Sequence, residues 1–279
     1  MIVDSVSNIT KELSEDYGID VIPYYITYGG RTYKEDFNFD RVRFYKDLKE
    51  LKEFPTTAHP NMEDIFEAFS SVSKRYDEVV YLTVPSDLTK TFDLAVKIRE
   101  RFPDKRIEIY QGGIGIGRLA LLSLEAARMA EKGKGIEEVL EWIELCNQRA
   151  GFFGVLNTLE YLAKGGRIGK AQALLSSVLA IKPILTYREE SVVPEAKVST
   201  HRQALDWIIK KMRRDIEEQG AKRLKCVIDD AGNREWSCEV KERIEKEFTC
   251  EELWQLEMSP VVGTHMGPGA WAVSYLLIY

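Results

Sequence analysis

The sequence has few residues of the kinds that hold metal ions or form disulfide frameworks. It contains four cysteines and three histidines among 279 residues, and no two cysteines stand in a CxxC pair or beside a histidine. A chain of this length can bury a core that is stable without disulfide bonds. We therefore expect reduced, chemically inert cysteines and no metal site.

The chain also lacks an excess of basic residues and long apolar runs. Its 39 Lys and Arg against 45 Asp and Glu give a net charge of −6, which opposes binding to nucleic acid and to anionic lipid surfaces. No stretch approaches the roughly 18 apolar residues of a membrane-spanning helix, and residues 1–10 lack the pattern of a targeting peptide. The sequence predicts a cytoplasmic protein without a nucleic-acid partner.

Common nucleotide and nucleophile motifs are missing as well. No Walker A lysine motif and no GxSxG motif occurs, and the three histidines show no triad or zinc spacing. The glycine run at 113–117 reads GxGxG instead of GxGxxG, and it follows the fourth or fifth strand instead of the first. These observations weigh against a bound dinucleotide and predict no cofactor.

What the sequence does contain is the composition and periodicity of an α/β protein. Hydrophobic residues make up 44% of the chain and charged residues 30%, which is typical of a compact globular protein. In the first half, strand-like runs at 21–28, 79–84 and 107–110 alternate with helical patterns, as at 91–101 and 119–130. This alternation predicts a mostly parallel sheet with helices on both faces.

The pattern changes near residue 150. A helical pattern at about 171–179 precedes strand-like residues 184–198, and neighbouring strands of this part could be antiparallel. We expect two α/β domains, at residues 1–150 and 151–279, the second with a smaller mixed or antiparallel sheet and helices. No linker rich in proline, glycine or serine separates the domains, so we expect a ligand in the cleft between them.

Loops that follow strands are the first place to look for a ligand. Ligands of open α/β sheets bind beyond the carboxyl ends of the strands, where loops and helix N-termini converge. Four such loops are rich in hydroxyls or glycine, at residues 4–5, 55–60, 85–91 and 111–117. Together they predict a neutral, donor-rich pocket for a small anion. The alternative is that each Ser or Thr only caps a helix or forms a turn.

Two stretches of the second half carry a candidate cation and a candidate imidazole. Arg167 follows a double glycine at the end of a helix, where it can bind the helix C-terminus or clamp an anion. Residues 260–269 place His265 among glycines, which predicts a flexible segment able to approach a ligand closely. A purely structural role for His265 is the alternative.

Seven short segments, in order from end to end, resemble the DegV family. They are Val3-Asp4-Ser5, Thr57 in a proline-flanked loop, Leu88-x-x-Thr91-Phe92, the glycine loop through Gly117, Leu159-Glu160-Tyr161-Leu162 leading to Gly165-Gly166-Arg167-Ile168, Ile181-Lys182-Pro183-Ile184, and Gly263-Thr264-His265-x-Gly267-Pro268-Gly269. Characterised members of that family are the fatty-acid-binding subunits of bacterial fatty acid kinase. The resemblance implies a cytoplasmic bacterial protein of phospholipid metabolism that buries one long-chain fatty acid between its domains. It also implies an ATP-binding kinase subunit as partner, which converts the presented carboxylate to an acyl phosphate.

The same resemblance implies roles for individual residues. Thr57, Thr89 and His265 would bind the carboxylate, and Arg167 would assist the partner's phosphoryl transfer. The acyl chain would lie against Leu174, Leu175, Val178 and Leu179. Since the kinase brings ATP and Mg²⁺, this chain would be a substrate-binding subunit and not a complete enzyme. A transient contact with the membrane is compatible with this role.

Other functions stay open at this point, because some positions depart from the family's usual pattern. Ala58 and His59 stand where serine and glutamine are usual, and Lys90 stands where glycine is usual. We expect Lys90 either to extend into solvent or to reach the anion and change the ligand. The alternatives are a stand-alone enzyme, with His265 as acid or base, and a regulatory binding module for another apolar carboxylic acid.

Overall fold

The computed structural model describes residues 1–51, 53–175 and 181–279, and contacts divide the chain into two compact units. Unit 1 comprises Met1–Phe39 and Pro55–Gln148, and unit 2 comprises Asp40–Phe54 and Arg149–Tyr279. The main division lies next to the boundary expected at residue 150. In addition, a short early segment belongs with the C-terminal part of the chain.

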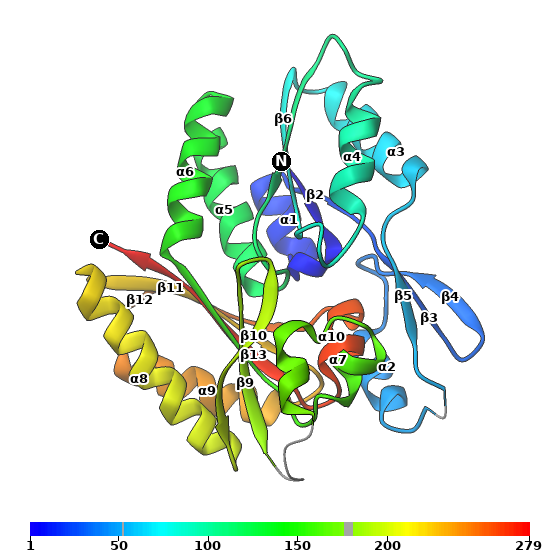
Figure 1. The fold of residues 1–279 in the computed structure, drawn as a ribbon. Coiled ribbons are helices and arrows are strands. Elements are labelled where there is room, and N and C mark those ends of the chain that lie inside the picture. Colours follow the sequence, from blue (N-terminus) through cyan, green and yellow to red (C-terminus); the bar gives the residue numbers. More distant parts are fainter. Residues whose placement is uncertain (52, 176–180) are drawn as a thin grey trace. The chain divides into compact units, whose positions relative to one another are not determined.

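Unit 1 is built on a parallel sheet in the order β2-β1-β6-β7. Its strands are β1 (Ile2–Asp4), β2 (Asp20–Ile22), β6 (Glu78–Thr83) and β7 (Arg106–Gln111). In Figure 1, α3 (Met62–Ser73) and α4 (Thr91–Arg99) lie on one side of this sheet, and α5 (Gly117–Glu131) and α6 (Ile136–Arg149) lie on the other. The parallel sheet with helices on both faces is therefore confirmed.

Side-chain caps set the ends of the helices in unit 1. The Asn61 side chain accepts from the backbone N–H groups of Glu63 and Asp64, and the Asp64 carboxylate accepts from the Asn61 N–H at 3.1 Å. This reciprocal pair begins α3. Helix α1 (Lys11–Tyr17) ends at Gly18, whose φ of 59° lies in the left-handed region that favours glycine.

Residues 21–28 form two strands where the sequence predicts one. β2 ends at Ile22, and β3 (Tyr25–Tyr28) belongs to a separate antiparallel sheet with β4 (Arg31–Lys34) and β5 (Thr56–Ala58). Between them, Pro23 has no N–H to donate, and the N–H of Tyr24 donates to Ser5 Oγ at 3.0 Å. The chain therefore leaves the parallel sheet at Pro23.

Unit 2 is built on a mixed sheet in the order β10-β9-β8-β13-β11-β12, six strands among the described residues. The strands are β8 (Ala150–Val155), β9 (Lys182–Arg188), β10 (Ser191–Val198), β11 (Arg223–Asp230), β12 (Cys250–Glu257) and β13 (Trp271–Ile278). β11 and β12 are parallel, and the other neighbouring pairs are antiparallel. The expected mixed sheet is confirmed, but the expectation that it is the smaller sheet is wrong: among the described residues it has two more strands than the parallel sheet of unit 1.

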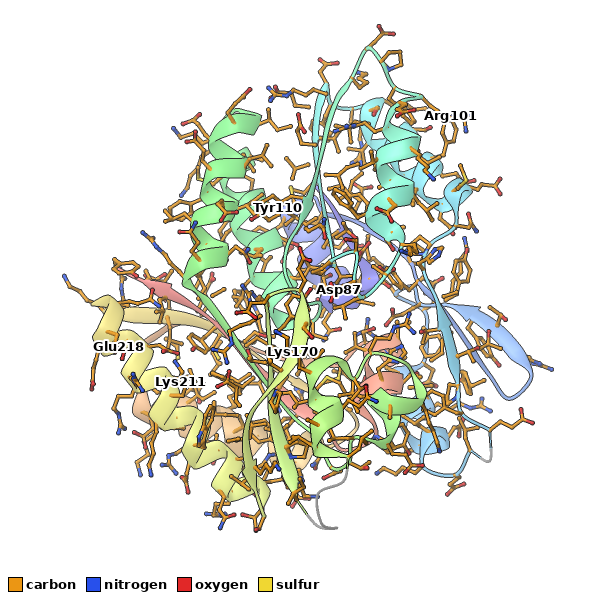
Figure 2. The ribbon with its side chains drawn as sticks, in the orientation of Figure 1. Asp87, Arg101, Tyr110, Lys170, Lys211 and Glu218 are labelled. Atoms are coloured by element: carbon orange, nitrogen blue, oxygen red, sulfur yellow. The ribbon has the colours of Figure 1, made fainter. Side chains whose placement is uncertain are left out.

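Two long helices cover the sheet of unit 2. Apolar residues of α8 (His201–Gln219) and α9 (Arg234–Glu247), such as Ile208 and Val240, form one core with Trp271 of β13. The polar side of α8 carries ion pairs between successive turns, including Arg214 with Glu218 at 2.6 Å. Figure 2 labels Lys211 and Glu218 along this helix.

Residues 260–266 form helix α10 (Pro260–Met266), where the sequence analysis expects a flexible segment; that expectation is wrong. The Ser259 hydroxyl oxygen accepts from the Val262 N–H at 3.3 Å, and Pro260 occupies the first turn. A serine cap followed by proline is a helix start signal. The glycines that follow are weak helix formers and obscured it. His265 therefore lies in the last turn of a helix.

The early segment 40–54 belongs to unit 2 because helix α2 (Arg41–Leu48) is anchored beside α10. The Tyr45 hydroxyl is buried and donates to the carbonyl oxygen of Met258 at 2.8 Å. A Cβ atom at Gly263 would lie 2.1 Å from the Tyr45 hydroxyl oxygen. Only glycine at position 263 leaves room for this contact.

We therefore expect Gly263→Ala to lower the free energy of unfolding by about 1–3 kcal/mol, because the new methyl group displaces the buried Tyr45 ring. Urea denaturation followed by circular dichroism measures the change. Gly135→Ala is the control, since a Cβ there meets only Glu137 Oε2 at 4.0 Å. Equal stability of the Gly263→Ala variant and the native chain would contradict this packing.

Candidate functional site

A buried carboxylate stands at the carboxyl edge of the parallel sheet in unit 1. Asp4 ends β1 and is fully buried. Its Oδ2 atom accepts from the Thr83 hydroxyl at 2.6 Å, the Val84 N–H at 3.1 Å and the Tyr24 hydroxyl at 3.1 Å. Its Oδ1 atom accepts from the Tyr81 hydroxyl. Burial raises the pKa of Asp4 to about 6, although these hydrogen bonds favour the charged form and limit the rise.

Thr89 joins this network through Tyr24 and Thr91. The Tyr24 and Thr91 hydroxyl oxygens are 2.8 Å apart, and those of Thr89 and Thr91 are 2.9 Å apart. Tyr24 is also 3.4 Å from Thr89 Oγ1. Thr91 is buried at the start of α4, whereas Thr89 lies partly exposed in the preceding loop. Thr89 is thus the outer end of a hydroxyl chain that begins at Asp4.

The Ser5 hydroxyl is used within the fold, through contacts other than the helix cap or turn that the alternative predicts. It is buried, its hydroxyl donates to Glu35 Oε2 at 2.7 Å, and its oxygen accepts from the Tyr24 N–H. In the glycine-rich loop, the Gln111 side chain likewise accepts from the Ser86 N–H at 2.9 Å. These groups hold the loops of unit 1 in place, and their hydrogen-bonding capacity is directed inward.

Thr57 and Lys90 are the other candidate residues of unit 1. Thr57 is half-buried in the middle of β5 and pairs with Ile26 of β3. The Lys90 side chain is 72% exposed, and its ammonium group lies 4.0 Å from the Asp93 carboxylate. Of the two alternatives for Lys90, this structure has the one in which the side chain extends into solvent.

His265 and Arg167 lie together in unit 2. A Cβ atom at Gly165 would be 2.1 Å from His265 Nδ1, so the imidazole packs directly on the Gly165 backbone. The Arg167 guanidinium donates to the carbonyl oxygen of Gly165 at 2.6 Å, at the end of helix α7 (Glu160–Lys164). Arg167 therefore binds a helix C-terminus, as one alternative predicts, while its side chain stays exposed.

The environment of His265 keeps its ring uncharged. Burial, reinforced by the Arg167 guanidinium, lowers the pKa of His265 to about 4. The imidazole is therefore neutral at pH 7 and has one N–H to donate and one nitrogen that can accept.

The expected acyl-chain residues fall partly outside the described residues. Residues Gly169–Leu174 form a 3₁₀ helix, where the sequence predicts the first part of an α-helix at 171–179. Leu174 is buried and Leu175 is 48% exposed. Val178 and Leu179 lie outside the described residues.

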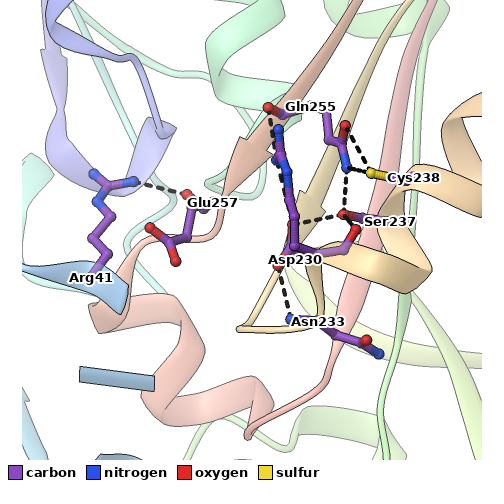
Figure 3. Close-up of polar contacts among 8 residues, drawn as sticks. Arg41, Asp230, Asn233, Ser237, Cys238, Gln255 and Glu257 are labelled. Carbon is purple, nitrogen blue, oxygen red and sulfur yellow. Dashed lines mark hydrogen bonds and ion pairs between the residues drawn. The ribbon is translucent and has the colours of Figure 1, made fainter. Parts of the chain in front are cut away.

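A second polar cluster stands at the carboxyl ends of β11 and β12 (Figure 3). Asp230 accepts from the Asn233 N–H at 2.9 Å and from the Ser237 hydroxyl at 2.8 Å, and Gln255 Nε2 donates to Ser237 Oγ at 2.7 Å. These bonds fasten the start of α9 to the sheet. We assign the cluster a structural role.

The described residues offer neither a cluster of metal ligands nor a membrane-spanning helix. The described residues hold no group of three or more His, Cys, Asp or Glu side chains placed to bind a metal ion. None of their helices has both the length and the apolar composition needed to cross a bilayer. Burial raises the pKa of the Cys226 thiol well above its usual value, which disfavours the reactive thiolate.

Two residues that hold the Asp4 carboxylate, Tyr24 and Tyr81, were not predicted from the sequence. The available signal was Asp4 itself, because an acidic residue that is buried at the end of a strand needs several donors around it. The sequence does not say which residues supply those donors, since they come from two segments far along the chain from Asp4, residue 24 and residues 81–84.

These features define the class of the protein. It is a two-unit α/β protein whose candidate ligand groups are hydroxyls and a neutral imidazole, with one exposed arginine beside the imidazole. A family model described as "Uncharacterised protein, DegV family" matches residues 1–277. A DegV domain-containing protein from Clostridium perfringens is 34% identical over 227 residues, which is 80% of each chain. The chain belongs to the DegV family.

Solved structures share the fold over nearly the whole chain. A DegV family protein from Thermus thermophilus, described by its fatty acid binding, superposes with a TM-score of 0.93 and 26% identity, covering 99% of this chain and 98% of its own. A Thermotoga maritima protein described as having a fatty acid binding function gives a TM-score of 0.87 and 26% identity with the same coverage. Fatty acid binding is thus documented for DegV proteins of this fold.

We expect the His265 imidazole to titrate with a midpoint near pH 4, as measured by its ring proton resonances in NMR spectra, with His265→Gln for assignment. Arg167→Gln should raise the midpoint but leave it below 6.5, because burial is the larger cause of the shift and a nearby cation the smaller one. A midpoint at or above 6.5 in the native chain would show that the ring is solvated.

Proposed function

We propose that this protein binds one long-chain fatty acid and presents its carboxylate to an ATP-dependent kinase partner, which phosphorylates it to an acyl phosphate. The observation that carries the proposal is the similarity, over 99% of the chain, to a Thermus thermophilus protein described by its fatty acid binding. The protein would then be a cytoplasmic substrate-binding subunit of phospholipid metabolism. It would meet the membrane only transiently, to collect the fatty acid.

Thr57, Thr89 and His265 form the proposed head-group set. Two hydroxyls and a neutral imidazole can donate three hydrogen bonds to a carboxylate without neutralising its charge. Its oxygen remains a nucleophile for the γ-phosphorus atom of ATP. The neutral state of His265, with its pKa lowered to about 4, supports this assignment.

Arg167 is the proposed residue for the transfer step. A carboxylate oxygen forms a bond to the γ-phosphorus atom, the bond from that atom to the β,γ-bridging oxygen breaks, and ADP leaves. The partner supplies ATP and Mg²⁺, because this chain has no phosphate-binding lysine motif. Arg167 is exposed and lies beside His265, so its charge is available to the transferring phosphoryl group.

The tail of the fatty acid supplies the affinity. Burial of a methylene contributes about 0.8 kcal/mol, so a chain of about 16 carbons offers on the order of 10 kcal/mol before the costs of association are subtracted. Leu174 and Leu175 are proposed to contact it, together with Val178 and Leu179. Leu175 is 48% exposed, and an apolar ligand would cover this surface favourably.

We expect the purified protein to carry a fatty acid that native mass spectrometry detects and that solvent extraction releases. Thr89→Val should weaken binding about tenfold, because the carboxylate loses one donor while the side chain keeps its shape. Lys90→Gly is the matched control and should leave both affinity and ligand identity unchanged, since the ammonium group lies in solvent. Protein that neither carries nor takes up a fatty acid would refute the proposal.

Arg167→Ala separates binding from transfer. We expect the variant to bind fatty acid with native affinity, while phosphorylation of the bound acid by the ATP-binding kinase of the same genome falls by at least about 100-fold. Radiolabelled ATP and separation of the acyl phosphate measure the rate. Turnover by the isolated native chain, without a kinase, would instead favour the stand-alone enzyme.

A further inference from the structure

Tyr24 is held from two sides by the first two polar residues of the chain. The Tyr24 ring is buried, and its hydroxyl donates a hydrogen bond to the Asp4 carboxylate. Its backbone N–H donates to Ser5 Oγ at 3.0 Å, and its carbonyl oxygen accepts from the Glu35 N–H at 2.8 Å. Ser5 in turn donates to Glu35 Oε2 at 2.7 Å. Asp4 thus positions the side chain of Tyr24, and Ser5 positions the Tyr24 backbone.

The direction of the Tyr24 proton follows from the charge of its neighbours. A hydroxyl has one proton, and a hydrogen bond to a carboxylate is about twice as strong as one to a neutral oxygen. The Tyr24 proton therefore points to Asp4, which leaves the Tyr24 oxygen as an acceptor. Thr91, whose oxygen lies 2.8 Å away, is placed to donate to it.

In this order the contact between Thr89 and Thr91 uses the Thr89 proton, because the Thr91 proton is directed to Tyr24. Thr89 Oγ1 lies 2.9 Å from Thr91 and 3.4 Å from Tyr24, and its backbone N–H donates to the Pro85 carbonyl oxygen at 3.2 Å. A carboxylate is a stronger acceptor than the Thr91 oxygen, so the Thr89 proton can turn to an anion by rotation about the C–O bond, without movement of the oxygen. A donor held in place in advance loses little conformational freedom on binding.

We propose that Tyr24 is the positioning residue of the head-group site: held by Asp4, its hydroxyl acts with Thr91 to fix Thr89 as a donor to the carboxylate. The inference rests on the proposed function, in which Thr89 binds that carboxylate. It adds that Tyr24, a buried residue that does not contact the ligand, makes the site prefer a carboxylic acid to an alcohol.

Tyr81 offers a matched control for Tyr24. Both tyrosines are buried and both donate to Asp4, yet in the described part of the chain the Tyr81 hydroxyl has no hydrogen bond to Thr89. The variants Tyr24→Phe and Tyr81→Phe each remove one hydroxyl from the same carboxylate. A purely structural role would give them the same effect on ligand binding.

The test compares palmitic acid with 1-hexadecanol on the delipidated full chain at pH 8, by competition against a fluorescent fatty acid. We expect the native protein to prefer the acid. Tyr24→Phe should weaken acid binding about tenfold and change alcohol binding less than twofold. Tyr81→Phe should keep the native ratio of the two affinities even where its melting temperature falls.

A second pair of variants covers the case in which Tyr24→Phe does not fold. Thr91→Val removes the hydroxyl between Tyr24 and Thr89 and should reduce the preference for the acid, whereas Thr91→Ser should retain it. If the native chain prefers the acid and the Tyr24→Phe or Thr91→Val variant keeps its ratio, the inference is overturned and the proposed function stands. If the native chain binds no palmitic acid, both fail together.

Discussion

The structure of unit 1 depends on the need to satisfy one buried negative charge. Asp4 is fully buried, and a carboxylate in such a place is tolerated only when donors surround it. Its four donors are Tyr24, Tyr81, Thr83 and Val84. These residues come from β6, the residue after it and the connection between β2 and β3, so one side chain fixes how three segments meet. The loop with Thr89 is fixed through the same contacts.

In unit 2, burial against Gly165 keeps the His265 imidazole uncharged. The His265 ring lies against Gly165, and burial together with Arg167 keeps the pKa of the ring well below 7. Each unit thus offers an uncharged donor, the Thr89 hydroxyl in one and the imidazole in the other. An uncharged donor can bind a carboxylate without transferring a proton to it, which is what the proposed function requires of Thr89 and His265.

Periodicity and capping signals predicted the fold class well. The alternation of strands and helices in unit 1 and the start of α3 at Asn61 can be read from local sequence. The break at Pro23 and the helix at Pro260 were missed because an apolar run masked the first and glycines the second. The membership of residues 40–54 in unit 2 depends on Tyr45 contacting Met258, more than 200 positions away, which no local pattern reports.

The candidate site, like the fold, was predicted only in part from the sequence. The roles of Thr57, Thr89, Arg167 and His265 came from a family resemblance, whereas the hydroxyl chain from Asp4 to Thr89 is a property of tertiary contacts. The most direct test of the account is a crystal structure of the protein purified from cells. The account predicts density for an acyl chain, with its carboxylate within hydrogen-bonding distance of Thr57, Thr89 and His265. A protein that contains no acyl chain even after incubation with a fatty acid, or a carboxylate held by other residues, would contradict it.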